Sequence, residues 1–124
     1  MSILVVEDDA MIRAALARVL AKTGHTVLEA ADGAKALECL RTVQPRPSLI
    51  LLDLVMPVMD GVQFRRAQLA DPDLACIPVV VLTAASQTEA ETAELRAVAV
   101  LIKPIEMVDL LGAVAQVIGP HTAG

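Results

Sequence analysis

The sequence predicts a doubly wound α/β fold built on a parallel sheet. Five short apolar segments lie along the 124 residues, and helical patterns separate them. Four of the segments are nearly continuous in Val, Ile, Leu and Ala, as strands covered on both faces usually are. A strand–helix unit repeated five times requires right-handed crossovers between parallel strands. We therefore expect one (βα)5 domain with a five-stranded parallel sheet.

The expected strands comprise residues 3–6, 26–30, 49–52, 79–82 and 98–102. The second strand carries Glu29 within its apolar sequence, and such a charge is more typical of an edge strand than of a central one. We expect the strand order 2-1-3-4-5, which is the flavodoxin-like arrangement. In that order the first and third strands are neighbours.

Helical periodicity connects the strands. The first helix places one set of apolar residues on a single face and directs Arg13 away from it; the set comprises Met11, Ile12, Ala15, Leu16, Val19 and Leu20. Asp32-Gly33 and Asp60-Gly61 open the second and third helices. A polar fourth helix is expected over residues 86–95 and a fifth over 105–118. The domain should occupy residues 1–119, followed by a frayed tail over 120–124.

Composition argues against several classes of function. The net charge is −5 and no basic patch is present, which disfavours direct binding of nucleic acid. Only 1% of the residues are aromatic, so a stacked flat-ring cofactor is not expected. No signal peptide or membrane-spanning segment is apparent. Cys39 and Cys76 form no metal or redox motif, and we expect both to be free thiols. Free thiols suit a reducing compartment, so we expect a cytoplasmic protein.

Polar residues stand directly after four of the five expected strands. Glu7 and Asp8 follow the first strand, Asp53 the third, Thr83 the fourth and Lys103 the fifth. Ligands of open α/β sheets bind outside the carboxyl ends of the strands. With the strand order 2-1-3-4-5, the acids after the first and third strands should converge at that edge.

Converging carboxylates are costly unless one carboxyl group holds its proton or a cation lies between them. Two like charges 4 Å apart repel by about 1 kcal/mol in water and about 4 kcal/mol at an effective dielectric constant near 20. An all-oxygen site of this kind suits Mg²⁺, which often shares a phosphate oxygen. The ammonium of Lys103 and the hydroxyl of Thr83 would help to stabilise a transferring phosphoryl group. The Asp53 carboxylate could itself be the nucleophile and form an aspartyl phosphate.

These residues lie in four segments that resemble the signature segments of bacterial two-component response regulator receiver domains. The segments are ILVVEDD (3–9), LDLVMPVMDG (52–61), VLTA (81–84) and IKP (102–104). The resemblance extends over essentially the whole chain, in order. The chain is similar in particular to the stand-alone receivers of the chemotaxis type.

The resemblance implies specific roles for the site residues. Asp53 would be the phosphoacceptor, and Thr83 and Lys103 would contact the phosphoryl group. A Mg²⁺ ion would be held by Glu7, Asp8, Asp53 and the backbone carbonyl of Val55. The Lys103–Pro104 peptide bond would be cis. Asp9, by contrast, is interpreted as the cap of the first helix rather than as a metal ligand.

The same resemblance implies a function in signalling. A sensor histidine kinase or a histidine phosphotransfer protein would supply the phosphoryl group. The phosphorylated domain would then bind a downstream protein through its fourth helix, fifth strand and fifth helix. Such a domain catalyses only its own phosphorylation and dephosphorylation and is otherwise not an enzyme, and it contacts neither membrane nor nucleic acid directly.

Two features depart from the family pattern. Val100 stands where an aromatic residue is common, three positions before the lysine, and residues 95–99 lack the glycine that usually ends the fourth helix. One alternative is therefore a receiver-like scaffold that no longer takes phosphate. A hydrolase with an aspartyl nucleophile would need a second carboxylate at the position of Val55. A flavodoxin-like cofactor carrier would need a phosphate-binding loop and stacking aromatic residues.

Overall fold

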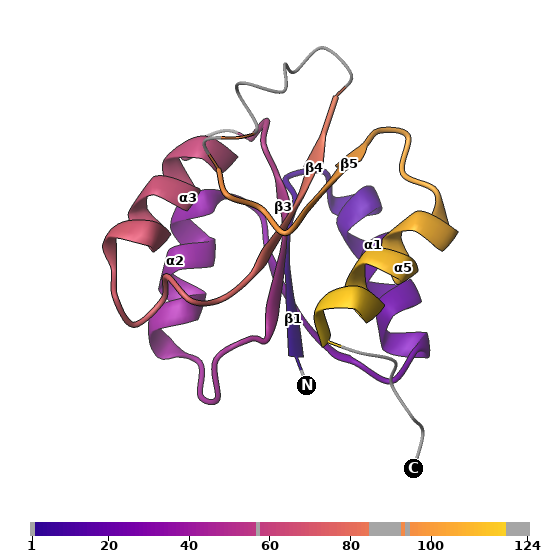
Figure 1. Cartoon of the computed structure of the whole chain (residues 1–124), viewed down its shortest axis with the longest axis horizontal. Helices are drawn as coiled ribbons and strands as arrows, with labels where there is room; N and C mark the ends of the chain where they lie inside the picture. The colour runs from indigo at the N-terminus through magenta and orange to yellow at the C-terminus, as the bar shows by residue number, and fades with distance from the viewer. Residues whose placement is uncertain (1, 57, 85–92, 94, 119–124) are drawn as a thin grey trace.

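The computed structural model describes residues 2–56, 58–84, 93 and 95–118. Figure 1 shows the predicted doubly wound fold, and the strand order is β2-β1-β3-β4-β5 with every neighbouring pair parallel. The strands are β1 (Ser2–Val6), β2 (Thr26–Ala30), β3 (Leu49–Asp53), β4 (Val79–Thr83) and β5 (Ala99–Ile102). The helices are α1 (Ala10–Lys22), α2 (Gly33–Thr42), α3 (Gly61–Ala70) and α5 (Met107–Ile118).

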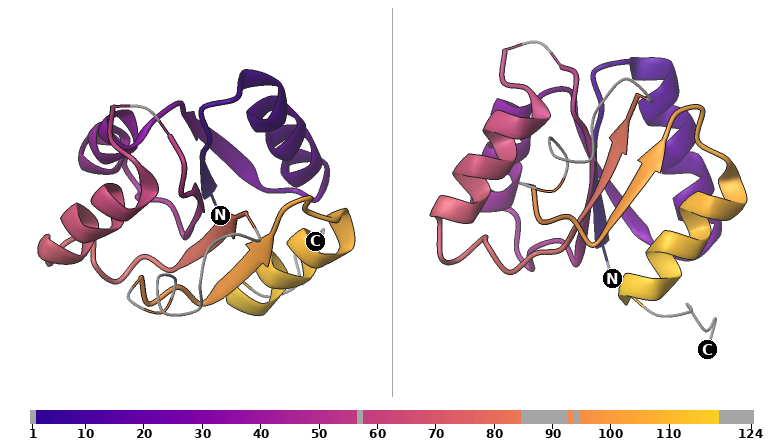
Figure 2. Two further views of the ribbon diagram at one scale, coloured as in Figure 1. Left: turned by 90° about the horizontal axis from the view of Figure 1, so that it is seen from above. Right: turned by 45° about the horizontal axis from the view of Figure 1, so that its top comes forward.

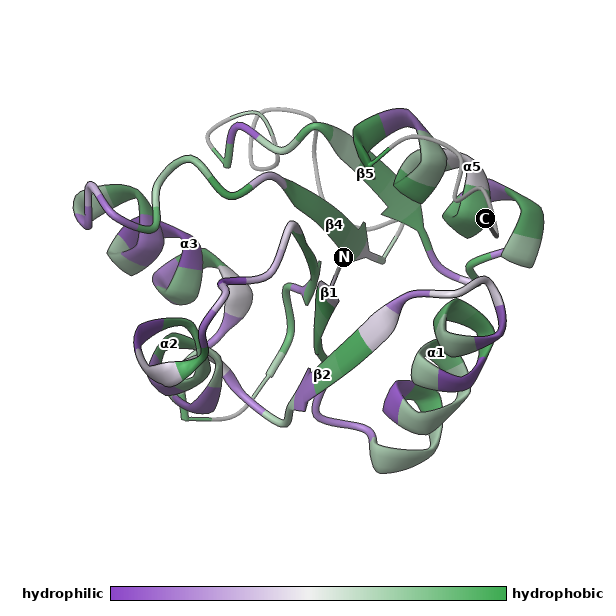
Figure 3. Ribbon diagram, turned by 90° about the horizontal axis from the view of Figure 1, so that it is seen from below, coloured by the Kyte–Doolittle hydropathy of each residue, from purple (hydrophilic) through white to green (hydrophobic). Residues whose placement is uncertain are grey.

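The sheet lies between two layers of helices. Helices α1 and α5 cover one face and α2 and α3 cover the other (Figures 1 and 2). Alternate residues of a strand enter different layers: Leu4 and Val6 pack on the side of α2 and α3, and Ile3 and Val5 pack on the side of α1 and α5. All four side chains are fully buried, and each contributes roughly 1.5–3 kcal/mol to folding. The sheet is mostly hydrophobic along its strands (Figure 3), as a two-sided core requires.

Several boundaries differ from the expected ones. Strands β3 and β4 each extend one residue further, so that Asp53 and Thr83 are their last residues. Strand β5 begins one residue later than expected. Helix α5 begins two residues later than expected, because the Glu106 carbonyl accepts the first hydrogen bonds of that helix. The expected fourth helix lies almost entirely outside the described residues, and so does the expected tail over 120–124.

The helix starts follow the sequence closely. Asp9, Asp32 and Asp60 are the N-caps of α1, α2 and α3, and each side chain accepts a hydrogen bond from the first turn. Asp60 and Gln63 together form a capping box. The interpretation of Asp9 as a cap is therefore confirmed. None of the described helices combines the length and apolar character needed to cross a bilayer.

The predicted inner face of α1 is wrong in its first turns. Met11 is 84% exposed, and Ala15 is also exposed, whereas Leu16 and Leu20 are buried as expected. Leu16 and Leu20 belong to the same core cluster as Leu110 and Val114 of α5, whereas Ala15 borders a gap between α1 and the start of α5. Both cysteines are free thiols, as their positions in the sequence suggested.

A buried arginine links α3 to the segment before β5. The Arg65 side chain donates to the Leu95 carbonyl at 2.7 Å, to the Arg96 carbonyl at 3.1 Å and to the Gln68 amide oxygen at 2.8 Å. Gln68 in turn donates to two backbone carbonyls beyond α3. Arg96 has a φ of 52°, the left-handed conformation that favours glycine. Arg65 thus secures a turn in which the family's usual glycine is missing.

Replacing Arg65 with Met is expected to lower the free energy of unfolding by about 3 kcal/mol, because two buried acceptors and one partly buried acceptor would lose a charged donor. Urea denaturation followed by circular dichroism measures this loss. Arg66→Met is the matched control: Arg66 is the exposed neighbour on α3, and its replacement should change stability by less than about 0.5 kcal/mol. Equal stability of the two variants would contradict the role given to Arg65.

Candidate functional site

Three acids meet at the carboxyl edge of the sheet. Asp53 ends β3, and Glu7 and Asp8 follow the neighbouring strand β1. One carboxylate oxygen from each lies within 4.8 Å of the other two. Glu7 and Asp53 are buried, at 1% and 3% exposure, while Asp8 is exposed. Figure 2 (left) looks onto this edge from above.

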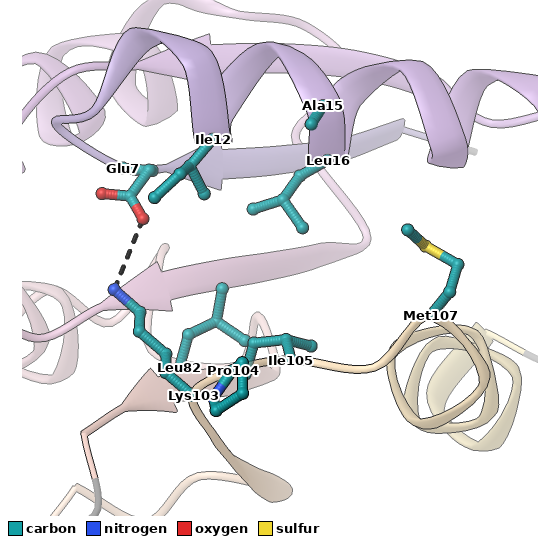
Figure 4. A pocket seen from close by; sticks show the side chains of 9 residues that line it. All are labelled: Glu7, Ile12, Ala15, Leu16, Leu82, Lys103, Pro104, Ile105 and Met107. Atoms are coloured by element: carbon teal, nitrogen blue, oxygen red, sulfur yellow. Dashed lines mark ion pairs between the residues drawn. The ribbon is translucent and has the colours of Figure 1, made fainter.

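Lys103 enters the cluster from the other side. It follows β5, and its Nζ lies 3.1 Å from Asp53 Oδ1 and 3.5 Å from Glu7 Oε1; Figure 4 shows the second contact. The Lys103 backbone N–H donates to the Thr83 carbonyl at 2.7 Å, which holds the start of this side chain against β4. The Lys103–Pro104 peptide bond is cis, as the resemblance implied.

Thr83 lies on the strand beside Asp53. The register of β3 and β4 pairs Asp53 with Leu82, one residue before Thr83. The Thr83 side chain is buried, and its hydroxyl lies 3.5 Å from the Ala84 carbonyl, at the outer limit of a hydrogen bond. The five polar residues that follow the strands in the sequence are therefore all at one edge. The side chains of four of them lie together, and Thr83 joins them through the bond from the Lys103 N–H to its carbonyl.

The loop after Asp53 is held tightly against α3. The Gly61 N–H donates to the Leu54 carbonyl at 3.0 Å. A Cβ atom on Gly61 would lie 2.6 Å from the Asp53 carbonyl oxygen, so no larger residue fits without a backbone shift. The Val55 N–H points to Asp53 Oδ1 at 3.4 Å. The Asp-Gly pair that starts α3 therefore keeps the backbone around Asp53 in place.

The acids and the lysine change each other's protonation. Burial, hydrogen bonds to Asp53 and Asp8, and the negative charge of Asp53 raise the pKa of Glu7 to about 7, although the Asp9 amide opposes this shift. Burial alone would lower the pKa of Lys103. The hydrogen bond to Asp53 and the charges of Asp53 and Glu7 outweigh burial, and the pKa of Lys103 is raised. The ammonium therefore stays charged, while Glu7 holds its proton to a higher pH than an ordinary glutamate does.

The donor atoms fit a divalent cation. Glu7 Oε1 is buried and accepts no hydrogen bond from any described residue; its contact is the ammonium 3.5 Å away. Magnesium prefers oxygen ligands at about 2.1 Å, which places them roughly 3–4.2 Å from one another in an octahedral shell. The three carboxylate oxygens need to approach only slightly to reach that spacing. A cation here would also balance the excess negative charge.

The raised pKa of Glu7 predicts a pH-dependent stability in the absence of metal. The ordinary value is 4.5, so the folded state holds this proton more tightly than the unfolded chain does. Stabilisation is then full below about pH 4.5 and is lost as the pH rises through about 7, a loss of about 3 kcal/mol at most. Lys103 titrates far above this range and does not interfere.

Urea denaturation in EDTA between pH 5 and pH 8 tests this prediction. Glu7→Gln should remove most of the decline, because the amide does not ionise. Glu29→Gln, which changes a half-exposed acid on β2, should retain it. A decline of the same size in all three proteins would assign the pH dependence to other groups.

Two features of the site are absent from the sequence prediction. The Arg13 side chain turns toward β1 and donates to the Glu7 carbonyl at 2.7 Å, although its position suggested a solvated face. A cavity of about 380 Å³ also opens between α1 and the residues that follow β5, with Glu7 and Lys103 at one end (Figure 4). Ile12, Ala15 and Leu16 line it from α1, and the cavity leaves Ile12 and Ala15 exposed. Neither feature has a signal in the sequence.

Known proteins share both the sequence pattern and the fold. The family model for the response regulator receiver domain matches residues 3–115. The chain is 36% identical to the transcriptional regulatory protein PdtaR of Mycobacterium tuberculosis over 115 residues, which cover 90% of this chain and 54% of that protein. It is 41% identical to the transcriptional regulatory protein PrrA of the same species, over 90% of this chain and 47% of that protein. The chain thus spans about half the length of these curated relatives.

Solved structures of receiver domains have the same fold. The signal receiver domain of a signal transduction histidine kinase from Syntrophus aciditrophicus superimposes with a TM-score of 0.88 at 31% identity, covering 99% of this chain and 93% of that one. The Vibrio cholerae chemotaxis protein CheY4 gives a TM-score of 0.84 at 30% identity, covering 94% of this chain and 97% of that one. Sequence, fold and the acidic edge lead to the same conclusion: the chain belongs to the family of response regulator receiver domains.

Proposed function

We propose that the chain is a phosphorylation-dependent switch in a two-component phosphorelay, with Asp53 as the phosphoacceptor. The observation that carries this proposal is the position of the Asp53 carboxylate. It is buried at the end of a central strand, 3.1 Å from an ammonium and within 4.8 Å of two further acids. A structural carboxylate needs one cationic partner, whereas this one lies among groups suited to hold both a metal and a phosphoryl group.

In the proposed reaction, an Asp53 carboxylate oxygen forms a bond to phosphorus as the bond between phosphorus and the donor's histidine nitrogen breaks. The electron pair of the broken bond returns to the donor imidazole. Lys103 would exchange part of its contact with Asp53 for a phosphoryl oxygen, and the Thr83 hydroxyl would donate to another. Both interactions strengthen as charge develops on the transferred group.

Magnesium would be held by Glu7, Asp8, Asp53 and the Val55 carbonyl. When bound, it would neutralise charge on the acids and on the phosphoryl oxygens. Lys103 supplies the remaining positive charge from the opposite side of the Asp53 carboxylate.

The donor would be a sensor histidine kinase or a histidine phosphotransfer protein, and output would be a change in protein contacts. Val100 and Ile102 of β5 are 40% and 58% exposed, which leaves apolar surface on the side expected to bind a downstream protein. The side chain of Val55 offers no acid or base, so turnover would be limited to the domain's own phosphorylation and dephosphorylation. The free thiols suit a reducing compartment such as the cytoplasm.

The experiment is incubation with acetyl phosphate, with Mg²⁺ or with EDTA, followed by intact-protein mass spectrometry. A switch should gain one phosphoryl group only when Mg²⁺ is present. The second candidate is a scaffold of the same fold that takes no phosphate, which the valine at position 100 favours. A scaffold would gain no mass under either condition, and that result would overturn the proposal.

A further inference from the structure

We infer that Arg13 is a positioning residue that orients Glu7 and Asp8 for the divalent cation. This inference rests on the proposed function, since it concerns the same site. Arg13 lies on α1 and would not touch the cation or the phosphoryl group itself. It acts on the backbone that carries the two acids.

The first observation is a short charge-assisted hydrogen bond. Arg13 Nη1 donates to the Glu7 carbonyl at 2.7 Å. On its other side, the Glu7 N–H donates to the Ala30 carbonyl at 3.1 Å. Both polar groups of the Glu7 backbone are therefore fixed, one by the end of β2 and one by α1. The direction of the Glu7 side chain depends on both bonds.

The second observation is the support that holds the guanidinium in place. Arg13 Nε lies 3.4 Å from Glu29 Oε1 on β2, and the Arg13 side chain is only 20% exposed. An isolated pair of this kind adds little to stability. Here the ion pair with Glu29 restricts the Arg13 guanidinium to an orientation that reaches the Glu7 carbonyl. Arg13 thus connects α1, β2 and the residue after β1.

The third observation is the shortness of the segment that carries the acids. Glu7 Oε2 accepts the Asp9 N–H at 3.2 Å, and Asp9 is the cap of α1. Asp8 lies between these two fixed points and is exposed, so little packing holds its side chain. Without the bond from Arg13, the peptide after Glu7 gains freedom to rotate, and Asp8 turns with it. Small displacements of this kind weaken a site that depends on ligand geometry.

The charge of Arg13 and its positioning effect predict opposite results. A positive charge near the acids repels a cation, so if charge alone mattered, removing it would tighten metal binding. If positioning dominates, removing the side chain weakens metal binding. We expect the second result, because the guanidinium is bonded to the backbone and is partly screened by solvent.

The test is titration of the whole chain with Mn²⁺, a paramagnetic substitute for Mg²⁺, followed by electron paramagnetic resonance. Arg13→Met should raise the Kd about tenfold, Arg13→Lys should restore part of the affinity, and Glu29→Gln should raise the Kd about threefold. Arg18→Met is the matched control on the exposed side of α1 and should stay within about twofold of wild type. With acetyl phosphate, Arg13→Met should need more Mg²⁺ for half-maximal phosphorylation but should reach the wild-type rate at saturation.

An unchanged or tighter Kd in Arg13→Met overturns the inference. If Arg13→Met fails to fold, an unchanged Kd in Glu29→Gln overturns the inference instead. Absence of Mn²⁺ binding to the wild-type protein would be a different result, because it removes the proposed metal site itself.

Discussion

Replacing Asp53 with asparagine is expected to abolish phosphoryl uptake. The amide has nearly the same shape as the carboxylate and still offers an oxygen to Lys103, 3.1 Å away in the wild-type protein. It lacks the negative charge and the nucleophilic oxygen that would form the bond to phosphorus. Uptake from acetyl phosphate in Mg²⁺ should fall at least about 1,000-fold, to background by intact-protein mass spectrometry.

Asp60→Asn is the matched control for this variant. Asp60 is seven positions further along the same motif, and asparagine caps helices as well as aspartate does, so α3 should be preserved. Uptake by Asp60→Asn should remain within about twofold of wild type. If Asp53→Asn were phosphorylated as fast as this control, Asp53 would not be the acceptor.

Replacing Lys103 with methionine should produce the second largest effect. The variant removes the ammonium that contacts Asp53 and Glu7 but keeps an apolar chain of similar length. Phosphorylation should slow by about 100-fold or more, since the phosphoryl oxygens would lose a preorganised charge worth about 3 kcal/mol in the transition state. Metal binding should become tighter, because a competing cation has been removed.

This combination of slower phosphorylation and tighter metal binding is specific to the proposed role. Lys35→Met removes an exposed ammonium from α2 and should change neither quantity. The rates are measured by mass spectrometry over time at saturating Mg²⁺, and the affinities by Mn²⁺ titration. A phosphorylation rate within about threefold of wild type would show that Lys103 is only a structural partner of Asp53.

The fold was predictable because a parallel sheet covered on both faces leaves a clear trace in a sequence. Its strands are continuous apolar segments, and its helix starts carry Asp9, Asp32 and Asp60. The candidate site was predictable for a related reason. All parallel strands end at one edge, so residues distant in sequence, such as Asp53 and Lys103, had to meet once the strand order was correct.

Features that depend on the packing of one helix against another were not predictable. Periodicity placed Met11 and Ala15 in the core, yet both are exposed, and Ala15 borders the cavity that also contains Lys103. The burial of Arg65 has no signal in the sequence, because two of its acceptors, the Leu95 and Arg96 carbonyls, lie 30 and 31 residues later. Arg13 reaches the Glu7 carbonyl only because β1, β2 and α1 meet at that point.

The proposed switch depends on one divalent cation shared by the acids after β1 and the acid after β3. Titration with Mn²⁺, in competition with Mg²⁺, tests this most directly. We expect one site in the wild-type protein and at least about tenfold weaker binding in Asp8→Asn and Asp53→Asn. Binding should be unchanged in Asp9→Asn, which keeps the cap of α1. Absence of a site in the wild-type protein, or equal affinity in all four proteins, would contradict it.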